Sequence, residues 1–267
     1  MDYFATLTQE NGRNPLPTNP CRLLDFELLV LSAGDSAGGS TGDREVLAVI
    51  LGGTATFTVG GHTFTDLGER ATVFDGKPAS VYMPAGVDYR ITAVSDVQIA
   101  LPSAPGTLQT EPYAILPDQV VAGVWGYDNH TRHFHQILVE SAQPELPAQR
   151  LIVGETFTPS GNWSTYPAHK HEQDNLPHEA YHEEMYYFRV TPADGFGITR
   201  FYRQREEATN YTVTDNSILM LPHGYHTYVG APGFQSYYLW FLAGEHRTQA
   251  VVADAVQTAA LQAMQEK

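Results

Sequence analysis

The chain has 267 residues, 42% hydrophobic and 17% charged, with 30 acidic against 15 basic residues and a net charge of −15. This composition predicts a compact globular protein, and the excess of acid argues against nucleic acid and membrane surfaces as partners, because clustered Lys and Arg bind those. A single cysteine, Cys21, excludes an intramolecular disulfide. The first residues lack a secretory signal, and no apolar run is long enough to span a membrane, so we expect a cytoplasmic protein.

Short runs of β-branched and aromatic residues, separated by Gly and Pro, predict many short antiparallel strands. Residues 46–51, 54–59 and 79–83 are such runs in the first half of the chain. Residues 246–267 lose this pattern. Instead, apolar residues recur there at helical spacing and predict a short C-terminal packing helix or a frayed tail, namely Val252, Val256, Ala259, Ala260 and Met264.

An internal repeat is visible in the strand-rich part. Residues 44–59 align with residues 183–198, which places Glu45 opposite Glu184, and residues 79–91 align with residues 217–229. We therefore predict an all-β bicupin-like fold: two tandem antiparallel β-barrel or jelly-roll domains and a short C-terminal helix. The boundary is expected in the Pro-containing stretch of residues 102–117, which gives an N-terminal domain of residues 1–118 and a C-terminal domain of residues 119–267.

A set of metal-ligating residue types lies in the second half. His169 and His171 would point to the same face of a strand, because successive side chains alternate, and His226 follows a Pro-x-Gly turn. With a carboxylate, these histidines suit zinc, manganese, iron or nickel better than calcium or magnesium, which prefer oxygen ligands. At the positions that correspond to His169 and His171 the first half has Val30 and Ser32 or their neighbours, and opposite His226 it has Asp88 or Tyr89, so we expect no metal there.

Two adjacent carboxylates, Glu183 and Glu184, compete for the fourth ligand position. Alternation puts Glu184 on the face that also carries Tyr186, Phe188 and Val190, which resembles a barrel interior, and Glu183 on the face that ends in Arg189. We therefore predict His169, His171, Glu184 and His226 as the ligands. A second His-x-His pair, His133 and His135, lacks further ligands and is expected on a surface or interface strand.

The ligand set resembles that of the cupin superfamily, in which two histidines, a glutamate and a later histidine bind a metal inside a small barrel. The spacing from His171 to Glu184 is longer than usual for that superfamily, and His226 comes one residue early after the Pro-x-Gly turn. Both departures are shared by the 5-deoxy-glucuronate isomerases of myo-inositol breakdown. The chain closely resembles this group over residues 150–245, including residues 158–171, 183–187 and 195–197.

This resemblance implies an aldose–ketose isomerase that converts 5-deoxy-D-glucuronate to 5-dehydro-2-deoxy-D-gluconate. Zinc is the implied metal, and manganese or iron would satisfy the same ligands. Two alternatives stay open: an isomerase of 5-dehydro-4-deoxy-glucuronate in pectin breakdown, and a metal-dependent cupin dioxygenase. The partner would be a small anionic sugar acid, and a homo-oligomer is compatible with the sequence.

The remaining roles concern the general base and the cation that binds the substrate carboxylate. Glu155, Tyr186 and Tyr225 are the catalytic candidates, with Glu183 as a further base if the two faces of its strand are inverted. Arg200 is the first candidate for substrate binding, because it ends the family-like run of residues 195–200, and Arg189 and Lys170 are the others.

Overall fold

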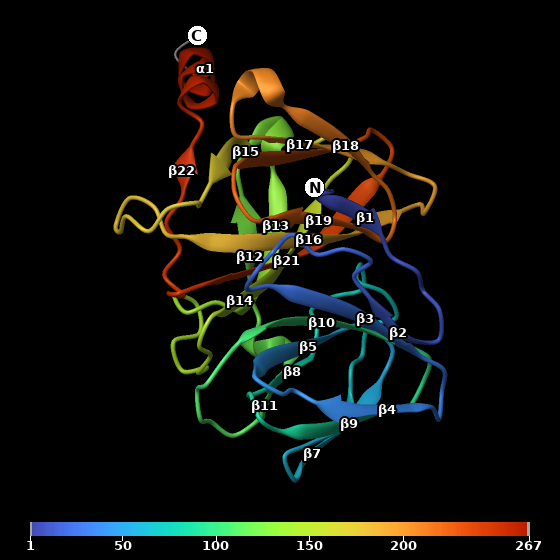
Figure 1. Cartoon of the computed structure of the whole chain (residues 1–267). Helices are drawn as coiled ribbons and strands as arrows, with labels where there is room; N and C mark the ends of the chain where they lie inside the picture. Colours follow the sequence, from blue (N-terminus) through green and yellow to red (C-terminus); the bar gives the residue numbers. More distant parts are fainter. Residues whose placement is uncertain (1, 266–267) are drawn as a thin grey trace.

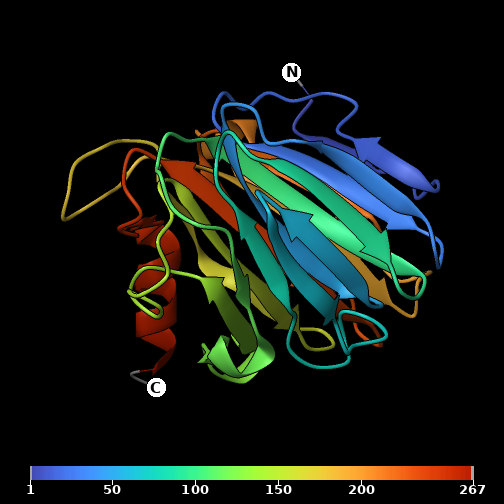
Figure 2. The same cartoon turned by 90° about the horizontal axis from the view of Figure 1, so that it is seen from below.

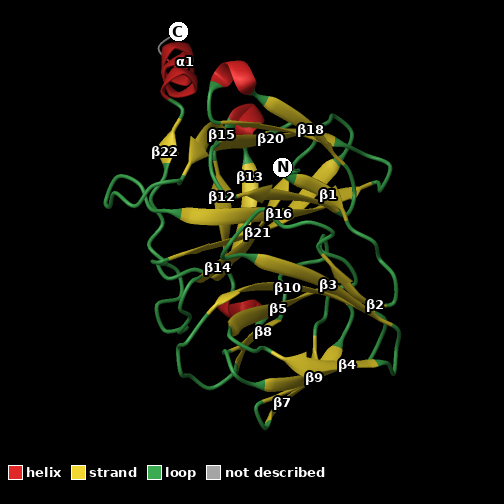
Figure 3. Cartoon of the chain, viewed as in Figure 1, coloured by secondary structure: helices red, strands yellow, loops and turns green. Residues whose placement is uncertain are grey.

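The structure is a computed structural model that describes residues 2–265, and its strands form four antiparallel sheets (Figures 1 and 3). Two of them come from the first half of the chain. The strands of the six-stranded sheet are, in spatial order, β11 (Tyr113–Ile115), β8 (Ser80–Met83), β5 (Arg44–Gly52), β10 (Val97–Pro105), β3 (Asp25–Leu31) and β2 (Gly12–Pro15). Those of the four-stranded sheet are β4 (Ser36–Ser40), β9 (Asp88–Ala93), β6 (Ala55–Val59) and β7 (His62–Leu67).

The second half forms a larger pair of sheets. The strands of the seven-stranded sheet are β1 (Phe4–Thr6), β19 (Ser217–Leu221), β16 (His182–Thr191), β21 (Gln235–Gly244), β14 (Leu151–Thr158), β13 (Arg132–Leu138) and β12 (Val121–Trp125). Those of the five-stranded sheet are β18 (Thr209–Val213), β17 (Gly197–Tyr202), β20 (Tyr225–Gly230), β15 (Trp163–Lys170) and β22 (Val252–Ala253). The helical segments are η1 (Pro117–Gln119), η2 (Asp128–His130), η3 (Arg205–Glu207) and α1 (Ala255–Gln265).

The four sheets stack as four layers, with the two largest sheets in the middle (Figure 1). One apolar cluster fills each sandwich, and a third cluster lies between the six-stranded and the seven-stranded sheet. Strand β5 therefore buries both faces: Leu47 and Val49 belong to the middle cluster, and Ala48 and Ile50 to the sandwich behind it. This explains why residues 46–51 are uniformly apolar instead of alternating.

The all-β class with a short C-terminal helix is as predicted. The predicted boundary between residues 118 and 119 falls inside η1, after the last strand of one sandwich and before the first strand of the other. Strand β1 departs from this division, because it crosses over and pairs with β19 of the second half. We keep the two-domain division as a proposal. Within residues 2–265, no helix has the length and apolar character needed to cross a bilayer.

The strand orders confirm the internal repeat. The orders β8-β5-β10-β3 and β4-β9-β6-β7 of the first half recur as β19-β16-β21-β14 and β15-β20-β17-β18 in the second. The pairing corrects the alignment by one residue. Val46 pairs with Met83 as Glu184 pairs with Leu221, so the counterpart of Glu184 is Val46 and not Glu45. A one-residue slip of this kind moves a side chain to the opposite face.

The same register identifies what the first half carries in place of the second half's histidines. Ser40 pairs with Asp88 as His169 pairs with His226, so Ser40 is the counterpart of His169. The expected counterparts of the histidine pair, Val30 and Ser32, are therefore wrong, whereas Asp88 is the right counterpart of His226. The two halves therefore share the path of the chain, but they differ in the side chains at the positions of the metal ligands.

Glu45 has its true counterpart in Glu183, and both carboxylates join the two halves. Glu45 is buried and accepts hydrogen bonds from the backbone N–H groups of residues 149–151, at 2.6 to 2.8 Å. Glu183 is equally buried and accepts hydrogen bonds from the backbone N–H groups of residues 22–24, at 2.7 to 3.1 Å. Each half thus supplies one carboxylate that accepts hydrogen bonds from backbone N–H groups of the other half.

Helix α1 stands at one side of the molecule, as the view from below shows (Figure 2). Two of the apolar residues expected to pack, Val256 and Met264, are 59% and 75% exposed. Gln257 makes the contact instead: its amide oxygen accepts a hydrogen bond from the backbone N–H of Ala168, and its amide nitrogen donates to Tyr202 Oη. The helix is held by polar contacts to β15 and β17, which the apolar spacing did not predict.

The carboxylate link between the halves generates the first prediction. Replacing Glu45 by Gln turns one acceptor into an amide donor that faces backbone N–H groups, so the free energy of unfolding should fall by about 3 kcal/mol. Urea denaturation followed by circular dichroism measures this. The matched control is Glu69→Gln, because Glu69 is exposed. Equal stability of the two variants would contradict the role assigned to Glu45.

Candidate metal centre

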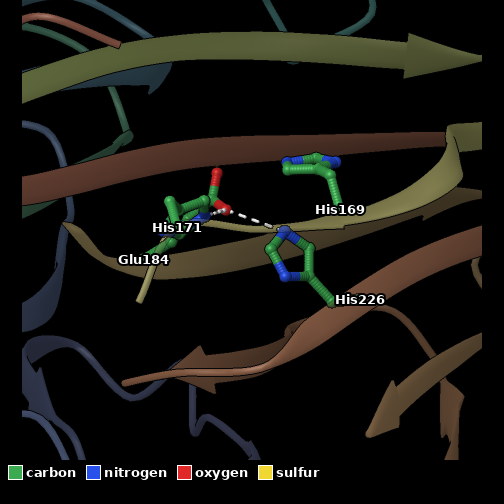
Figure 4. Close-up of side chains that lie close together, drawn as sticks. All are labelled: His169, His171, Glu184 and His226. Carbon is green, nitrogen blue, oxygen red and sulfur yellow. Dashed lines mark hydrogen bonds and ion pairs between the residues drawn. The ribbon is translucent and has the colours of Figure 1, made fainter. Parts of the chain in front are cut away.

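The four ligands predicted from the sequence lie together in the structure. One potential ligand atom from each of His169, His171, Glu184 and His226 can be chosen so that all lie within 4.8 Å of one another. Figure 4 shows the four side chains pointing toward a common centre. His171, Glu184 and His226 are buried and His169 is partly buried, so the cluster lies inside the second sandwich.

Strand pairing explains this convergence. His169 on β15 is the direct partner of His226 on β20, and Glu184 extends from β16, on the opposite sheet of the sandwich. Strand β15 carries a register shift between Ser164 and His169, and Thr165 within it has a φ of 57°. A bulge of this kind re-aims the following side chains, and such conformations are frequent beside functional sites.

Backbone carbonyls hold two of the rings in one tautomer. His171 Nδ1 lies 2.7 Å from the carbonyl oxygen of His182, and His226 Nδ1 lies 3.2 Å from that of Gly224. Each Nδ1–H therefore donates to a carbonyl, which leaves Nε2 as an acceptor with a free lone pair. Gly224 has a φ of +89°, a conformation that favours glycine and that positions its carbonyl for this contact.

Both of these Nε2 atoms lie 3.0 Å from the same oxygen, Oε2 of Glu184. Lone pairs on two rings and a carboxylate oxygen repel one another unless a proton or a metal ion stands between them. His226 Nε2 is buried and makes no well-formed hydrogen bond within the described part of the chain. This arrangement fits a divalent cation, with three imidazole nitrogens and one carboxylate oxygen as its ligands.

The pKa shifts follow the same pattern. Burial would raise the pKa of Glu184, but its interactions with His171 and His226 outweigh burial and lower that pKa. Burial lowers the pKa of His171, but the Glu184 carboxylate and the backbone hydrogen bond to His182 together raise it, so the net shift is upward. Burial and the neighbouring rings of His226 and His171 lower the pKa of His169 well below its ordinary value. A neutral His169 keeps a lone pair available for a metal.

A small cavity of about 130 Å³ opens beside this cluster. His169 and Glu184 line it, and its other lining residues are Trp125, Arg132, Thr156, Thr165, Tyr186, Tyr238, Trp240 and Gln249. Glu184 is the one carboxylate among these residues. Of the three catalytic candidates, Tyr186 lies here, and burial followed by the charge of Glu184 raises its pKa well above the ordinary value. Its hydroxyl therefore stays protonated at neutral pH.

Glu155 does not lie in the cavity. It is fully buried on the face of β14 that also carries Val153 and Phe157, toward the first half of the chain. There it accepts hydrogen bonds from Arg70 Nη1 at 3.0 Å and from His135 Nδ1 at 2.7 Å. Burial would raise the pKa of Glu155, but Arg70 and His135 lower it. Glu155 thus links the halves, and His135 is an interface histidine, as expected.

Tyr225 and Lys170 also lie away from the cavity, because each alternates with a ligand histidine and faces the other side of its strand. The ring of Tyr225 stacks on Tyr202 with 5.3 Å between centroids. Lys170 Nζ makes ion pairs with Glu172 at 2.8 Å and Glu179 at 3.3 Å. Glu183, the further candidate for the base, faces away from the cavity, and its carboxylate accepts hydrogen bonds from the backbone N–H groups of residues 22–24.

The two arginines chosen from the sequence point elsewhere as well. Arg189 pairs with Asp215 and Gln98, both at 2.8 Å, and lines a separate cavity of about 860 Å³ formed by both halves. Arg200 precedes Phe201, the strand partner of His226, so it faces away from the ligands. It lies over the Tyr202 ring, on the side of the sheet where α1 lies.

One cation that sequence reasoning missed does line the cavity. Arg132, the first residue of β13, pairs with Trp125 across the β12–β13 hairpin. It lies outside residues 150–245, where the resemblance is strongest, and nearly forty residues before His169. The available signal was its position next to an aromatic hairpin strand in an acidic chain, which does not by itself indicate the metal cluster.

Comparison with known proteins gives a family and close relatives. The KduI/IolB family matches residues 11–258. The 5-deoxy-glucuronate isomerase of Geobacillus kaustophilus (strain HTA426) is 40% identical over 225 residues, which cover 84% of this chain and 80% of that protein. The protein of the same name from Bacillus subtilis (strain 168) is 38% identical over 227 residues, 84% of this chain and 82% of that one.

Solved structures agree with this result. The crystal structure of an IolB-like protein from Salmonella typhimurium LT2 has a TM-score of 0.91 and 29% identity, and the match covers 97% of this chain and 99% of that one. Oxalate decarboxylase from Lactobacillus farciminis, at 12% identity and a TM-score of 0.67 over 100% of this chain and 93% of its own, shares the fold alone. These likenesses confirm the predicted bicupin fold. From the extent of the family match and the identity of its relatives, the chain belongs to the KduI/IolB family.

Proposed function

We propose that the protein is an aldose–ketose isomerase that converts 5-deoxy-D-glucuronate to 5-dehydro-2-deoxy-D-gluconate in myo-inositol catabolism. The observation that carries this proposal is the 40% identity to a 5-deoxy-glucuronate isomerase over 84% of the chain. The convergent ligand set supports it, because the reaction needs a centre that stabilises negative charge on two neighbouring oxygens.

His169, His171, Glu184 and His226 would hold the metal, and zinc is our first choice because three imidazoles and a carboxylate suit it. Manganese and iron would accept the same ligands. When bound, the ion supplies Lewis-acid polarisation of the substrate carbonyl and its neighbouring hydroxyl.

The chain's own residues would contribute proton placement and exclusion of water. Moving the carbonyl from C1 to C2 removes one proton from C2 and adds one at C1, and the intermediate between these steps carries negative charge on the two oxygens. Tyr186, two residues after Glu184 on β16, presents a protonated hydroxyl to the cavity and would donate a hydrogen bond to one of these oxygens. Trp125, Trp240 and Tyr238 line the same space with aromatic surface, which limits solvent around the reacting atoms.

Neither alternative function is favoured. Eight curated relatives that are 36 to 40% identical to the chain all carry the name of the 5-deoxy-glucuronate isomerase. Oxalate decarboxylase shares the fold at 12% identity and indicates nothing about this chain's reaction. A cytoplasmic location and a homo-oligomeric state stay predictions from the sequence.

The proposed reaction is tested directly by adding 5-deoxy-D-glucuronate to zinc-loaded protein and following the keto product by ¹³C NMR. We expect the same equilibrium mixture of aldose and ketose with and without oxygen, because the isomerisation consumes no oxidant. A strict requirement for oxygen would favour the dioxygenase. Turnover of 5-dehydro-4-deoxy-glucuronate in preference to 5-deoxy-D-glucuronate would favour the pectin-pathway enzyme.

The metal proposal predicts the behaviour of His226→Ala. Removing one of four ligands should lower the bound metal to a small fraction of one ion per chain and abolish isomerisation. Elemental analysis of the purified variant measures this. His133→Ala is the matched control, because His133 is an exposed strand histidine outside the cluster, and it should keep its metal. Full metal occupancy in His226→Ala would disprove the ligand assignment.

The role of Tyr186 predicts a kinetic effect separable from stability. Tyr186→Phe should lower kcat about a hundredfold at unchanged metal content, because a donor to a developing oxyanion is lost. Tyr187→Phe is the control: Tyr187 is equally buried on the other face of β16, where it donates to Asn216. That variant should lose stability and keep kcat. Equal kcat values for the two variants would exclude the proposed role.

A further inference from the structure

A guanidinium group without a counter-charge lines the cavity beside the metal ligands. Among residues 2–265, the side chain of Arg132 has neither a hydrogen-bond nor an ion-pair partner, and its Nε is buried. Its one close contact is with an aromatic ring: Arg132 Cζ lies 5.4 Å from the centroid of the Trp125 ring. The charge of Arg132 acts on His169, Tyr186 and Tyr238, which places it electrostatically within this site.

This arrangement is unusual for an acidic protein. With 30 acidic and 15 basic residues, carboxylates are in excess, and two of the three other cations considered for substrate binding pair with them. Lys170 pairs with Glu172 and Glu179, and Arg189 pairs with Asp215. Leaving a partly buried arginine unpaired costs free energy unless a ligand provides the missing charge. Arg132 is therefore poised to bind an anion that comes from outside the chain.

The surroundings of Arg132 also fix its orientation. Trp125, which carries the guanidinium on its face, stacks on Phe134 with 3.9 Å between ring centroids and lies 6.5 Å from Trp240. A planar guanidinium held on a ring keeps its edge N–H groups free for a planar acceptor with two oxygens. A carboxylate matches this fork with two parallel hydrogen bonds.

The size of the cavity limits the ligand. A volume of about 130 Å³ admits a small molecule and not a polymer. Two residues of the ligand cluster, His169 and Glu184, line this cavity together with Arg132, so one small sugar acid would contact both ends of it. An aldehyde end at the cluster and a carboxylate end at Arg132 would place C1 and C2 next to Glu184 and Tyr186, which line the same space.

We propose that Arg132 binds the carboxylate of the sugar-acid substrate and so selects uronates over neutral aldoses. This inference rests on the proposed function. It replaces Arg200, the first choice from sequence, because Arg200 lies on the opposite face of its sheet. Arg132 acts here as a specificity residue: it touches the end of the substrate that does not react.

The test compares Arg132→Gln, Arg132→Lys and Arg200→Gln in zinc-loaded protein. Arg200 is a matched control because it too lies over an aromatic ring, at 5.6 Å from the Tyr202 centroid, but outside the cavity. Three quantities are measured: kcat/KM for 5-deoxy-D-glucuronate, the affinity for D-glucuronate and D-glucose by calorimetry, and the metal content.

Arg132→Gln should lose about a hundredfold in kcat/KM and in the preference for D-glucuronate over D-glucose, at full metal content. Arg132→Lys should keep part of both, because the charge remains and the fork is lost, and Arg200→Gln should match the unaltered protein. The inference is overturned if Arg132→Gln keeps its preference for the acid, or if Arg200→Gln loses as much.

The two proposals fail in different ways. If the unaltered protein does not isomerise 5-deoxy-D-glucuronate but binds D-glucuronate through Arg132, the proposed reaction is wrong and the carboxylate site stands. If the protein isomerises the substrate and Arg132→Gln does so equally well, the reaction stands and the carboxylate site is wrong. Circular dichroism shows whether Arg132→Gln folds. If it does not, Arg132→Lys is compared with Arg200→Gln instead. An equal preference for D-glucuronate over D-glucose in these two variants would then count against the inference.

Discussion

The second sandwich is organised around a buried carboxylate that faces imidazole nitrogens whose ring protons are already used. His171 and His226 donate Nδ1–H to backbone carbonyls, and both present Nε2 to the same oxygen of Glu184 at 3.0 Å. Such an arrangement is unfavourable without a positive charge at the centre. In the metal-free protein a proton can fill that role, which is why the pKa of His171 is raised, and a divalent cation fills it with all four ligands at once.

The repeat shows how one scaffold separates structural from chemical roles. Glu45 and Glu183 occupy equivalent positions, and each satisfies backbone N–H groups of the other half, so the link between the halves exists in both copies. One residue further along the strand the copies differ: the first half has Val46 and the second has Glu184. Adjacent residues of a strand face opposite ways, so the contact between the halves and the ligand set inside the sandwich can vary independently.

Much of this could be predicted from the sequence. The all-β class, the repeat and the convergence of His169, His171, Glu184 and His226 follow from periodicity, spacing and a resemblance, and side-chain alternation along β16 separates Glu184 from Glu183. These features depend on local geometry, where the period of two in a strand applies directly. The bulge in β15 comes before His169, so His169, Lys170 and His171 still alternate, as the sequence predicted.

Residues whose roles depend on partners distant in sequence could not be predicted in this way. Glu155 is neutralised by Arg70 from the other half, and Arg200 faces outward because of the register between β17 and β20. Arg132 reaches the cavity through a hairpin that carries no metal ligand. The resemblance implied an acidic substrate and hence a cation to bind it, but the sequence could not show which one. Lys170 and Arg189 pair with protein carboxylates and Arg200 faces away from the ligands, which leaves Arg132.

The central claim is that three imidazoles and one carboxylate surround a single divalent ion. X-ray absorption spectroscopy on the zinc-loaded protein, with the metal content determined in parallel, tests it most directly. The account predicts one ion per chain with a first shell of nitrogen and oxygen that includes three imidazoles. Protein that takes up no ion after incubation with zinc, manganese or iron, or an ion whose shell contains fewer than three imidazoles, would contradict it.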